Sequence, residues 1–304
     1  MANNRLSILR TGWVLFALQV GCHREVSPTL KFAEVRYWSM PAVDHKVPAP
    51  RSLTIHGDEA YVLDTAGRVL VFDGSGTVVR SWYMPAYDVG RPEDIHVLKD
   101  GRIAVADTHY HRVVFFDTEG NVQGTLGEFG KGPGQFIYPV ALAEDDHGNL
   151  FVGEYGGNDR VQKFSAAGEV LKAFGRFGTL EGEFQRPSGL AWSAGKVFVA
   201  DAINCRILVF RDDGTYVKQL AGQPDDGSLE YPYDVELDGT GDLFVVEYRG
   251  GCVTQLTQTG ALVGRWGTTG TGDAHFSTPW GLAVDARRIL VADTGNRRIA
   301  ELRK

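Results

Sequence analysis

Two aspartates of this chain have the chemistry to bind a cation. Asp94 and Asp234 each stand two residues after a proline, where the equivalent places elsewhere in the chain hold the small residues Ser52, Ala141, Gly189 and Gly281. Carboxylate oxygens are preferred ligands of Ca²⁺, so these two aspartates are candidate metal ligands with Ca²⁺ as the ion. The alternative is that they bind backbone N–H groups or water. A carboxylate that holds an ion should accept no strong backbone donor of its own.

Aromatic and cationic side chains mark a second candidate site. Tyr155, Tyr248 and Arg249 stand in two polar turns that follow a Glu, whereas the equivalent turns elsewhere follow an Asp. Tyr233 and Trp280 each stand directly after a proline. Tyr, Trp and Arg are enriched at binding hot spots, so we expect these five residues to contact a protein or a small-molecule ligand. Sequence drift in tolerant loops is the alternative for the two turns.

Composition and motifs favour a binding module over an enzyme. The chain shows no Ser-His-Asp order and no nucleophile elbow, so no catalytic constellation is evident. The rival interpretation is a metal-dependent lyase or hydrolase with a divalent ion at a central channel, which would need an open coordination position. The formal net charge of −7 argues against a nucleic-acid partner, because such surfaces normally carry a basic stripe.

A repeat of 43 to 47 residues must position these side chains. Each copy opens on a proline and an apolar run, continues through a β-rich run that ends in an acid, and then has a polar turn. The acids are Asp64, Asp107, Glu154, Asp201, Glu247 and Asp293. The prolines are Pro50, Pro92, Pro139, Pro187, Pro232 and Pro279. Self-similarity at such a period indicates a solenoid, a propeller or an array.

The fourth copy shows what one repeat contains. Short β-rich runs at 188–192, 196–201, 206–210 and 216–222 are separated by Gly, Asn and Asp turns. This pattern predicts a four-stranded antiparallel meander. Several of the runs are continuously apolar, so both faces of the strands should be buried. Sheets packed radially against their neighbours satisfy that requirement, which predicts an all-β propeller.

The start of the predicted domain supplies one strand of the last blade. Residues 34–44 closely match residues 78–88, which form the outer strand of the first repeat and its exit loop. The last repeat ends at Lys304 after three strands. We therefore expect the leading segment to complete it, which closes the ring and removes two exposed sheet edges. Six acids and six prolines then predict six blades.

The repeated acid and arginine resemble the NHL repeat, whose consensus runs close to VADTGNHRIQVF. The chain has ILVADTGNRRIAEL at 289–302, and similar copies at 103–116 and 197–210. The resemblance implies a six-bladed propeller. In each copy the acid should accept turn N–H groups and pair with the arginine, while Asn204 and Asn296 suit left-handed turn positions. Amidating lyases resemble this fold and bind zinc through His directly after the blade-opening proline, but no His stands there in this chain.

The first 22 residues resemble a bacterial export signal. Arg5 and Arg10 precede an apolar run at 11–20 that is too short to span a bilayer as a mature helix. Gly21-Cys22 resembles a lipobox, which implies lipid attachment at Cys22; ordinary secretion or an uncleaved anchor are the alternatives. We expect a signal peptide at 1–21, a tether at 22–31 and the propeller at 32–304. The protein should then lie in the periplasm or on the cell surface, with a lipid anchor as its membrane contact.

Overall fold

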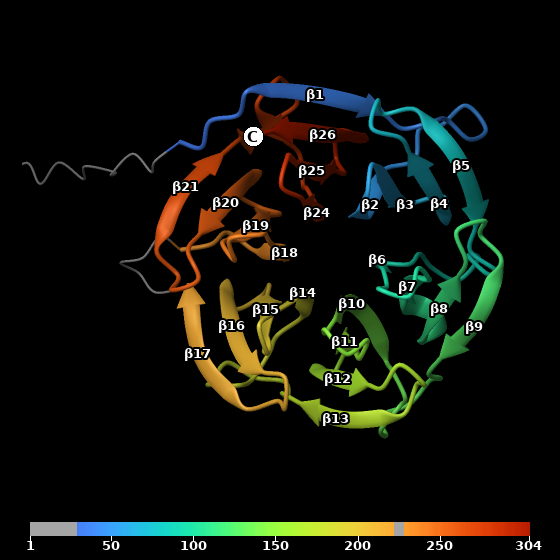
Figure 1. Ribbon diagram of the computed structural model, residues 1–304, viewed down its shortest axis with the longest axis vertical. Coiled ribbons are helices and arrows are strands. Elements are labelled where there is room, and N and C mark those ends of the chain that lie inside the picture. Colours follow the sequence, from blue (N-terminus) through green and yellow to red (C-terminus); the bar gives the residue numbers. More distant parts are fainter. Residues whose placement is uncertain (1–28, 222–227) are drawn as a thin grey trace, which may run out of the picture.

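Six four-stranded antiparallel sheets follow one another around a ring in the residues that the computed structural model describes, 29–221 and 228–304 (Figure 1). Each sheet is one blade, and its strands run in chain order from the ring axis to the rim in the first five blades. The all-β, six-bladed propeller predicted from the sequence is therefore confirmed. No helix within these two ranges is long and apolar enough to cross a membrane.

The strand bounds follow the repeat closely. Blades 1 to 3 comprise β2 (Pro50–His56), β3 (Glu59–Asp64), β4 (Arg68–Phe72) and β5 (Val78–Tyr83); β6 (Asp94–Val97), β7 (Ile103–Asp107), β8 (Arg112–Phe116) and β9 (Val122–Leu126); and β10 (Tyr138–Glu144), β11 (Leu150–Tyr155), β12 (Arg160–Phe164) and β13 (Val170–Phe174). Blades 4 to 6 comprise β14 (Pro187–Ser193), β15 (Lys196–Asp201), β16 (Arg206–Arg211) and β17 (Tyr216–Ala221); β18 (Pro232–Leu237), β19 (Leu243–Glu247), β20 (Cys252–Leu256) and β21 (Leu262–Trp266); and β24 (Gly281–Val284), β25 (Arg288–Asp293), β26 (Arg298–Arg303) and β1 (Glu34–Ser39). The connections add the short strands β22 (Thr268–Thr269) and β23 (His275–Phe276) and one 3-10 helix, η1 (Thr108–Tyr110).

The strand β1 closes the ring, as the sequence predicts. It pairs antiparallel with β26 from Glu34↔Arg303 to Ser39↔Arg298 and lies along the rim of the last blade (Figure 1). Its Trp38 is 4% exposed and stacks on Phe72 of blade 1, with ring centroids 5.6 Å apart. The N-terminal strand therefore joins blade 6 through its backbone and contacts blade 1 through a side chain.

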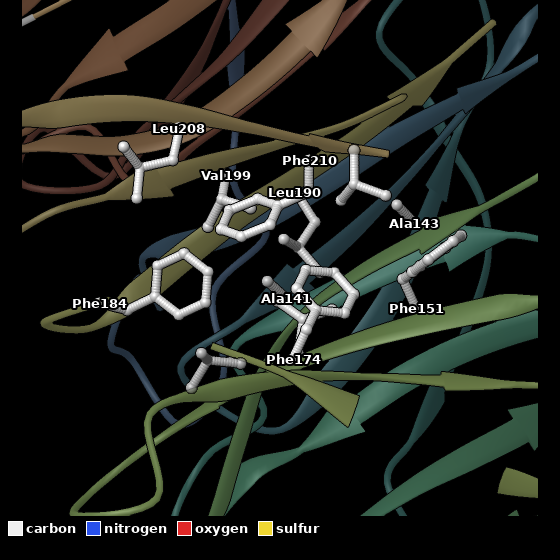
Figure 2. Close-up of a cluster of buried hydrophobic side chains, with 12 residues drawn as sticks. Ala141, Ala143, Phe151, Phe174, Phe184, Leu190, Val199, Leu208 and Phe210 are labelled. Atoms are coloured by element: carbon white, nitrogen blue, oxygen red, sulfur yellow. The ribbon is translucent and has the colours of Figure 1, made fainter. Parts of the chain in front are cut away.

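The hydrophobic cores lie between neighbouring blades. The second and third strands of the blades are buried on both faces, which explains their continuously apolar sequences. Figure 2 shows the core between blades 3 and 4, where Phe151 and Ala141 lie with Leu190 and Phe210. The outer strands are more exposed: β5 alternates along its length, and β9 and β13 are exposed at most of their residues.

The repeated acid and arginine form hydrogen bonds that hold a blade to the connection before it. In five blades the arginine Nε donates to the acid at 2.7–2.8 Å, from Arg68, Arg112, Arg160, Arg206 and Arg298. In blade 4, Asp201 accepts the backbone N–H of Gln185, and Arg206 donates to the carbonyls of Leu180 and Glu183. These residues are structural, as their recurrence predicts.

In blade 5, the arginine that pairs with the acid comes from a different strand. Cys252 stands at the arginine position, and Arg265 of β21 donates from its Nε to Glu247 at 3.3 Å. Glu247 is 1% exposed, so a cation from the outer strand keeps its buried charge compensated.

The prediction for the turn asparagines is wrong. The left-handed residues are Cys205 and Arg297, both with φ of 55°, which directly follow Asn204 and Asn296. Each Asn side chain instead donates to the acid of its own blade, at 2.7 Å to Asp201 and 2.8 Å to Asp293. In blade 2 the residue directly before the arginine, His111, is also left-handed with φ of 58°, although Tyr110 stands at the Asn position, so the turn itself and not the Asn sets the left-handed residue.

Candidate functional site

The residues that flank the blade-opening prolines meet at the ring axis. They line a cavity of about 410 Å³, which we call the axial pocket, together with residues of the turns after the second strands. Its lining is Arg51, Glu93, His109, Tyr155, Arg186, Tyr231, Tyr233, Tyr248, Arg249 and Trp280. Since these residues come from all six blades and their connections, the pocket lies at the axis. It lies on the face that bears the turns after the second strands, since His109, Tyr248 and Arg249 belong to those turns.

Four aromatic rings form one wall of the axial pocket. Tyr233 stacks on Trp280 with centroids 4.9 Å apart and an interplanar angle of 25°. Tyr248 lies 5.9 Å from Tyr233 and 6.4 Å from Trp280, and Tyr231 lies 5.6 Å from Tyr248. Contacts of this kind hold aromatic side chains in fixed positions, so the wall is preorganised.

A buried carboxylate organises one cation of the pocket. Glu93 is 7% exposed, and Arg186 donates from its Nη2 to Glu93 Oε2 at 3.2 Å. The same nitrogen donates to the hydroxyl of Tyr233 at 2.7 Å, and that hydroxyl lies 3.3 Å from Glu93. Burial opposes the charge on Arg186, but Tyr233 and Glu93 outweigh it and raise its pKa. The charge of Arg186 is thus compensated through its Nη2, although its Nε has no hydrogen-bond partner among the described residues.

Arg51 lacks comparable partners. Its side chain is 12% exposed, and Glu93 Oε1 lies 3.8 Å from its Nη2, which exceeds a hydrogen-bond distance. Its Nε has no hydrogen-bond partner among the described residues. The guanidinium lies 4.0 Å above the ring of Trp280. Burial lowers the pKa of Arg51, and the Glu93 carboxylate offsets this in part. The pocket therefore holds a cation whose hydrogen-bonding capacity is largely unused.

The two candidate metal ligands lie directly beneath the pocket, next in sequence to Glu93 and Tyr233. Asp94 accepts the hydroxyl of Ser52 at 2.6 Å and the backbone N–H groups of Ile95 at 2.8 Å and Leu142 at 2.7 Å.

Asp234 accepts the N–H groups of Val235 at 2.8 Å and Leu282 at 3.0 Å. The condition for a cation site, a carboxylate without backbone donors, is thus not met at either aspartate. The geometry matches the alternative interpretation, in which these carboxylates bind backbone N–H groups of the next blade.

Three acids share this region and repel one another. Burial raises the pKa of Asp94 to about 7, although hydrogen bonds from Ser52 and Leu142 act in the other direction. Burial also raises the pKa of Asp234 well above its usual value, and Asp94 adds to this by repulsion. The pKa of Glu236, a residue that the sequence did not single out, is also raised well above its usual value by burial and by repulsion from Asp234 and Asp94. Within the described ranges, no group of three or more His, Cys, Asp or Glu is arranged to hold a metal ion.

Known proteins with the same repeat match this chain. The family model of the NHL repeat matches residues 276–302. The chain is 29% identical to protein brain tumor of Drosophila melanogaster over 132 residues, which cover 42% of this chain and 12% of that protein. It is 32% identical to NHL repeat-containing protein 3 of Homo sapiens over 165 residues, covering 49% and 47%. The chain therefore has a match to the NHL repeat in its last blade, within a six-bladed β-propeller. The match spans less than half the length of either relative.

Solved structures support the propeller fold. Virginiamycin B lyase from Staphylococcus aureus superposes with a TM-score of 0.65 at 13% identity, over 90% of this chain and all of that one. At this identity the likeness establishes the architecture and carries no information about activity.

The propeller brings together most of the side chains that the sequence singles out. Tyr155, Tyr233, Tyr248, Arg249 and Trp280 all line the axial pocket. The lining residues that sequence reasoning missed are Arg51, Glu93, His109, Arg186 and Tyr231. The positions of Arg51 and Glu93 were a usable signal, because both directly follow a blade-opening proline, as Tyr233 and Trp280 do. Cys22 and the export signal lie outside the described residues.

Proposed function

We propose that this NHL propeller is an exported binding module that holds a small-molecule or protein ligand at the axial pocket. One observation carries the proposal: the five residues that the sequence singles out as ligand contacts, from blades 3, 5 and 6, all line one cavity. Pockets of a few hundred Å³ with aromatic walls and a few fixed polar groups are the usual form of a ligand site. A lipid on Cys22 would tether the module to a membrane outside the cytoplasm.

A fragment screen tests this proposal. Small organic compounds are added to the protein and binding is detected by ligand-observed NMR, first with the unmodified protein and then with Trp280→Ala. Fragments that bind at the axial pocket should lose their signal in Trp280→Ala. The matched control is Trp192→Ala, which removes a half-buried tryptophan of β14 that does not line the pocket.

The screen has a clear contrary outcome. If the fragments that bind do so equally well to both tryptophan variants, the axial pocket is not the binding site. Circular dichroism on each variant establishes that the propeller remains folded.

A metal-dependent lyase or hydrolase is the second candidate function. The observation that favours it is the set of three acids beneath the pocket, Asp94, Asp234 and Glu236, whose mutual repulsion a divalent cation would relieve. Two observations count against it: Asp94 and Asp234 already accept backbone N–H groups, and no group of three or more His, Cys, Asp or Glu among the described residues is arranged to hold a metal ion. Elemental analysis of the purified mature protein separates the two candidates, since a stoichiometric divalent metal supports the lyase or hydrolase.

A further inference from the structure

We propose that the axial pocket selects a small organic monocarboxylate with a flat apolar body, and that Arg51 binds the carboxylate group. This inference rests on the proposed function and adds the chemical class of the ligand.

Arg51 is the side chain that points to an anion. A guanidinium presents five N–H donors, which makes arginine the preferred partner for planar, bidentate recognition of carboxylates. Arg51 is largely buried, yet its Nε has no partner among the described residues and its closest approach to Glu93 is 3.8 Å. Burying an arginine in this state costs stability, because its lost hydration is not replaced. A ligand carboxylate would supply the missing acceptors.

The charge balance favours a monoanion. Arg51 and Arg186 carry two positive charges and Glu93 carries one negative charge, so this inner cluster has a net charge of one. A carboxylate neutralises it. A phosphate dianion would leave excess negative charge next to Glu93. Arg249, which is exposed and lies 5.1 Å from the ring of Tyr231, adds a positive charge at the rim that would attract an anion.

The walls favour an organic ligand over a hydrated inorganic ion. Tyr231, Tyr233, Tyr248 and Trp280 are in mutual contact, and Tyr155 lies 4.5 Å from the guanidinium of Arg186. Aromatic side chains gain most from contact with flat apolar surfaces, which bury area at little entropic cost. A cavity of about 410 Å³ has room for one or two rings with a short acid group.

Isothermal titration calorimetry with matched ligand pairs tests the assignment. The probes are indole-3-acetate against indole-3-acetamide, and benzoate against benzamide, which differ in charge and little in shape. At least one carboxylate should bind ten-fold or more tightly than its amide. Arg51→Gln should weaken carboxylate binding at least ten-fold and leave amide binding unchanged, while Arg51→Lys should retain part of the preference. Arg102→Gln is the control, because Arg102 also lies over an aromatic ring, that of Phe115, but outside the axial pocket.

Stability provides a readout that a purely structural arginine would not give. Glu93 keeps its ion pair with Arg186 when Arg51 is replaced. Arg51→Gln should therefore melt at the same temperature as the parent protein or higher, while it loses the carboxylate.

Each contrary result identifies what has failed. Equal binding of acid and amide at the pocket would overturn the carboxylate assignment and leave the proposed function standing. Tighter binding of phenyl phosphate than of either carboxylate would also overturn it. If none of these probes binds while fragments do bind in a Trp280-dependent manner, the ligand class is wrong and the pocket is right. If nothing binds at the pocket, both proposals fail.

Discussion

Removal of the Trp38 side chain should destabilise the whole propeller, because this residue packs the ring-closing strand β1 against blade 1. Trp38 is 4% exposed and packs between blades 6 and 1 in a core that includes Phe72 and Leu290. Large-to-small substitutions of buried Trp typically cost about 3–5 kcal/mol. For a domain of this size about 1 kcal/mol lowers the melting temperature by roughly 2–4 °C. Trp38→Ala should therefore melt roughly 6–20 °C below the parent.

Unfolding by urea, followed by circular dichroism, measures the effect without depending on tryptophan fluorescence. Trp38→Phe should lose much less stability, because it keeps the stacking on Phe72 and removes an indole N–H that has no partner among the described residues. Arg36→Ala is the control on the same strand, since its side chain is 45% exposed. Deletion of residues 32–44 should destabilise the protein strongly, and deletion of 23–30 should not. If Trp38→Ala and the longer deletion both unfold like the parent, the closing-strand account is refuted.

Four further predictions concern the anchor, the buried acids and blade 5. Cys22→Ala should release the protein from the membrane fraction or leave an unprocessed precursor; normal processing and membrane association would remove the lipoprotein hypothesis. The pKa of Asp94 is about 7 in the folded protein and about 3.9 in an unfolded chain, so the folded state holds the proton more tightly. Stability should then fall as pH rises from about 4 to 7, and Asp94→Asn should flatten that slope in urea titrations. Calcium should shift the melting temperature of the parent only if the aspartates bind it, and Asp94→Asn with Asp234→Asn should then abolish the shift. Arg265→Ala should cost about 3 kcal/mol in urea unfolding because it leaves buried Glu247 uncompensated, whereas an unchanged midpoint would show that the replacement arginine is dispensable.

The fold was predictable because the same order of apolar runs, acid and turn residues recurs in each repeat. Turn residues, apolar runs and the recurring acid define the strands, and the match between 34–44 and 78–88 assigns the closing strand. The left-handed turn positions were predicted wrongly because they fall directly before the arginine, at Cys205 and also at His111 in a copy without Asn, so the preference of Asn for this conformation does not locate them.

The site was partly predictable for a different reason. Deviations from the repeat identified Tyr248 and Trp280, but the role of the aspartates depends on contacts between blades. An innermost strand has a single neighbour in its own sheet, so some of its N–H groups lack ladder partners. Asp94 and Asp234 satisfy those of Leu142 and Leu282, which follow them by 48 residues. Hydrogen bonds between residues so far apart in the chain cannot be predicted from the sequence alone, because they depend on how neighbouring blades pack in the ring.

A crystal structure of the protein grown with indole-3-acetate tests the central claim most directly. We predict density for the ligand in the axial pocket, with its carboxylate within hydrogen-bond distance of Arg51 and its rings against the aromatic wall. A ligand bound at another face of the propeller, or an empty axial pocket at a saturating concentration, would contradict the account.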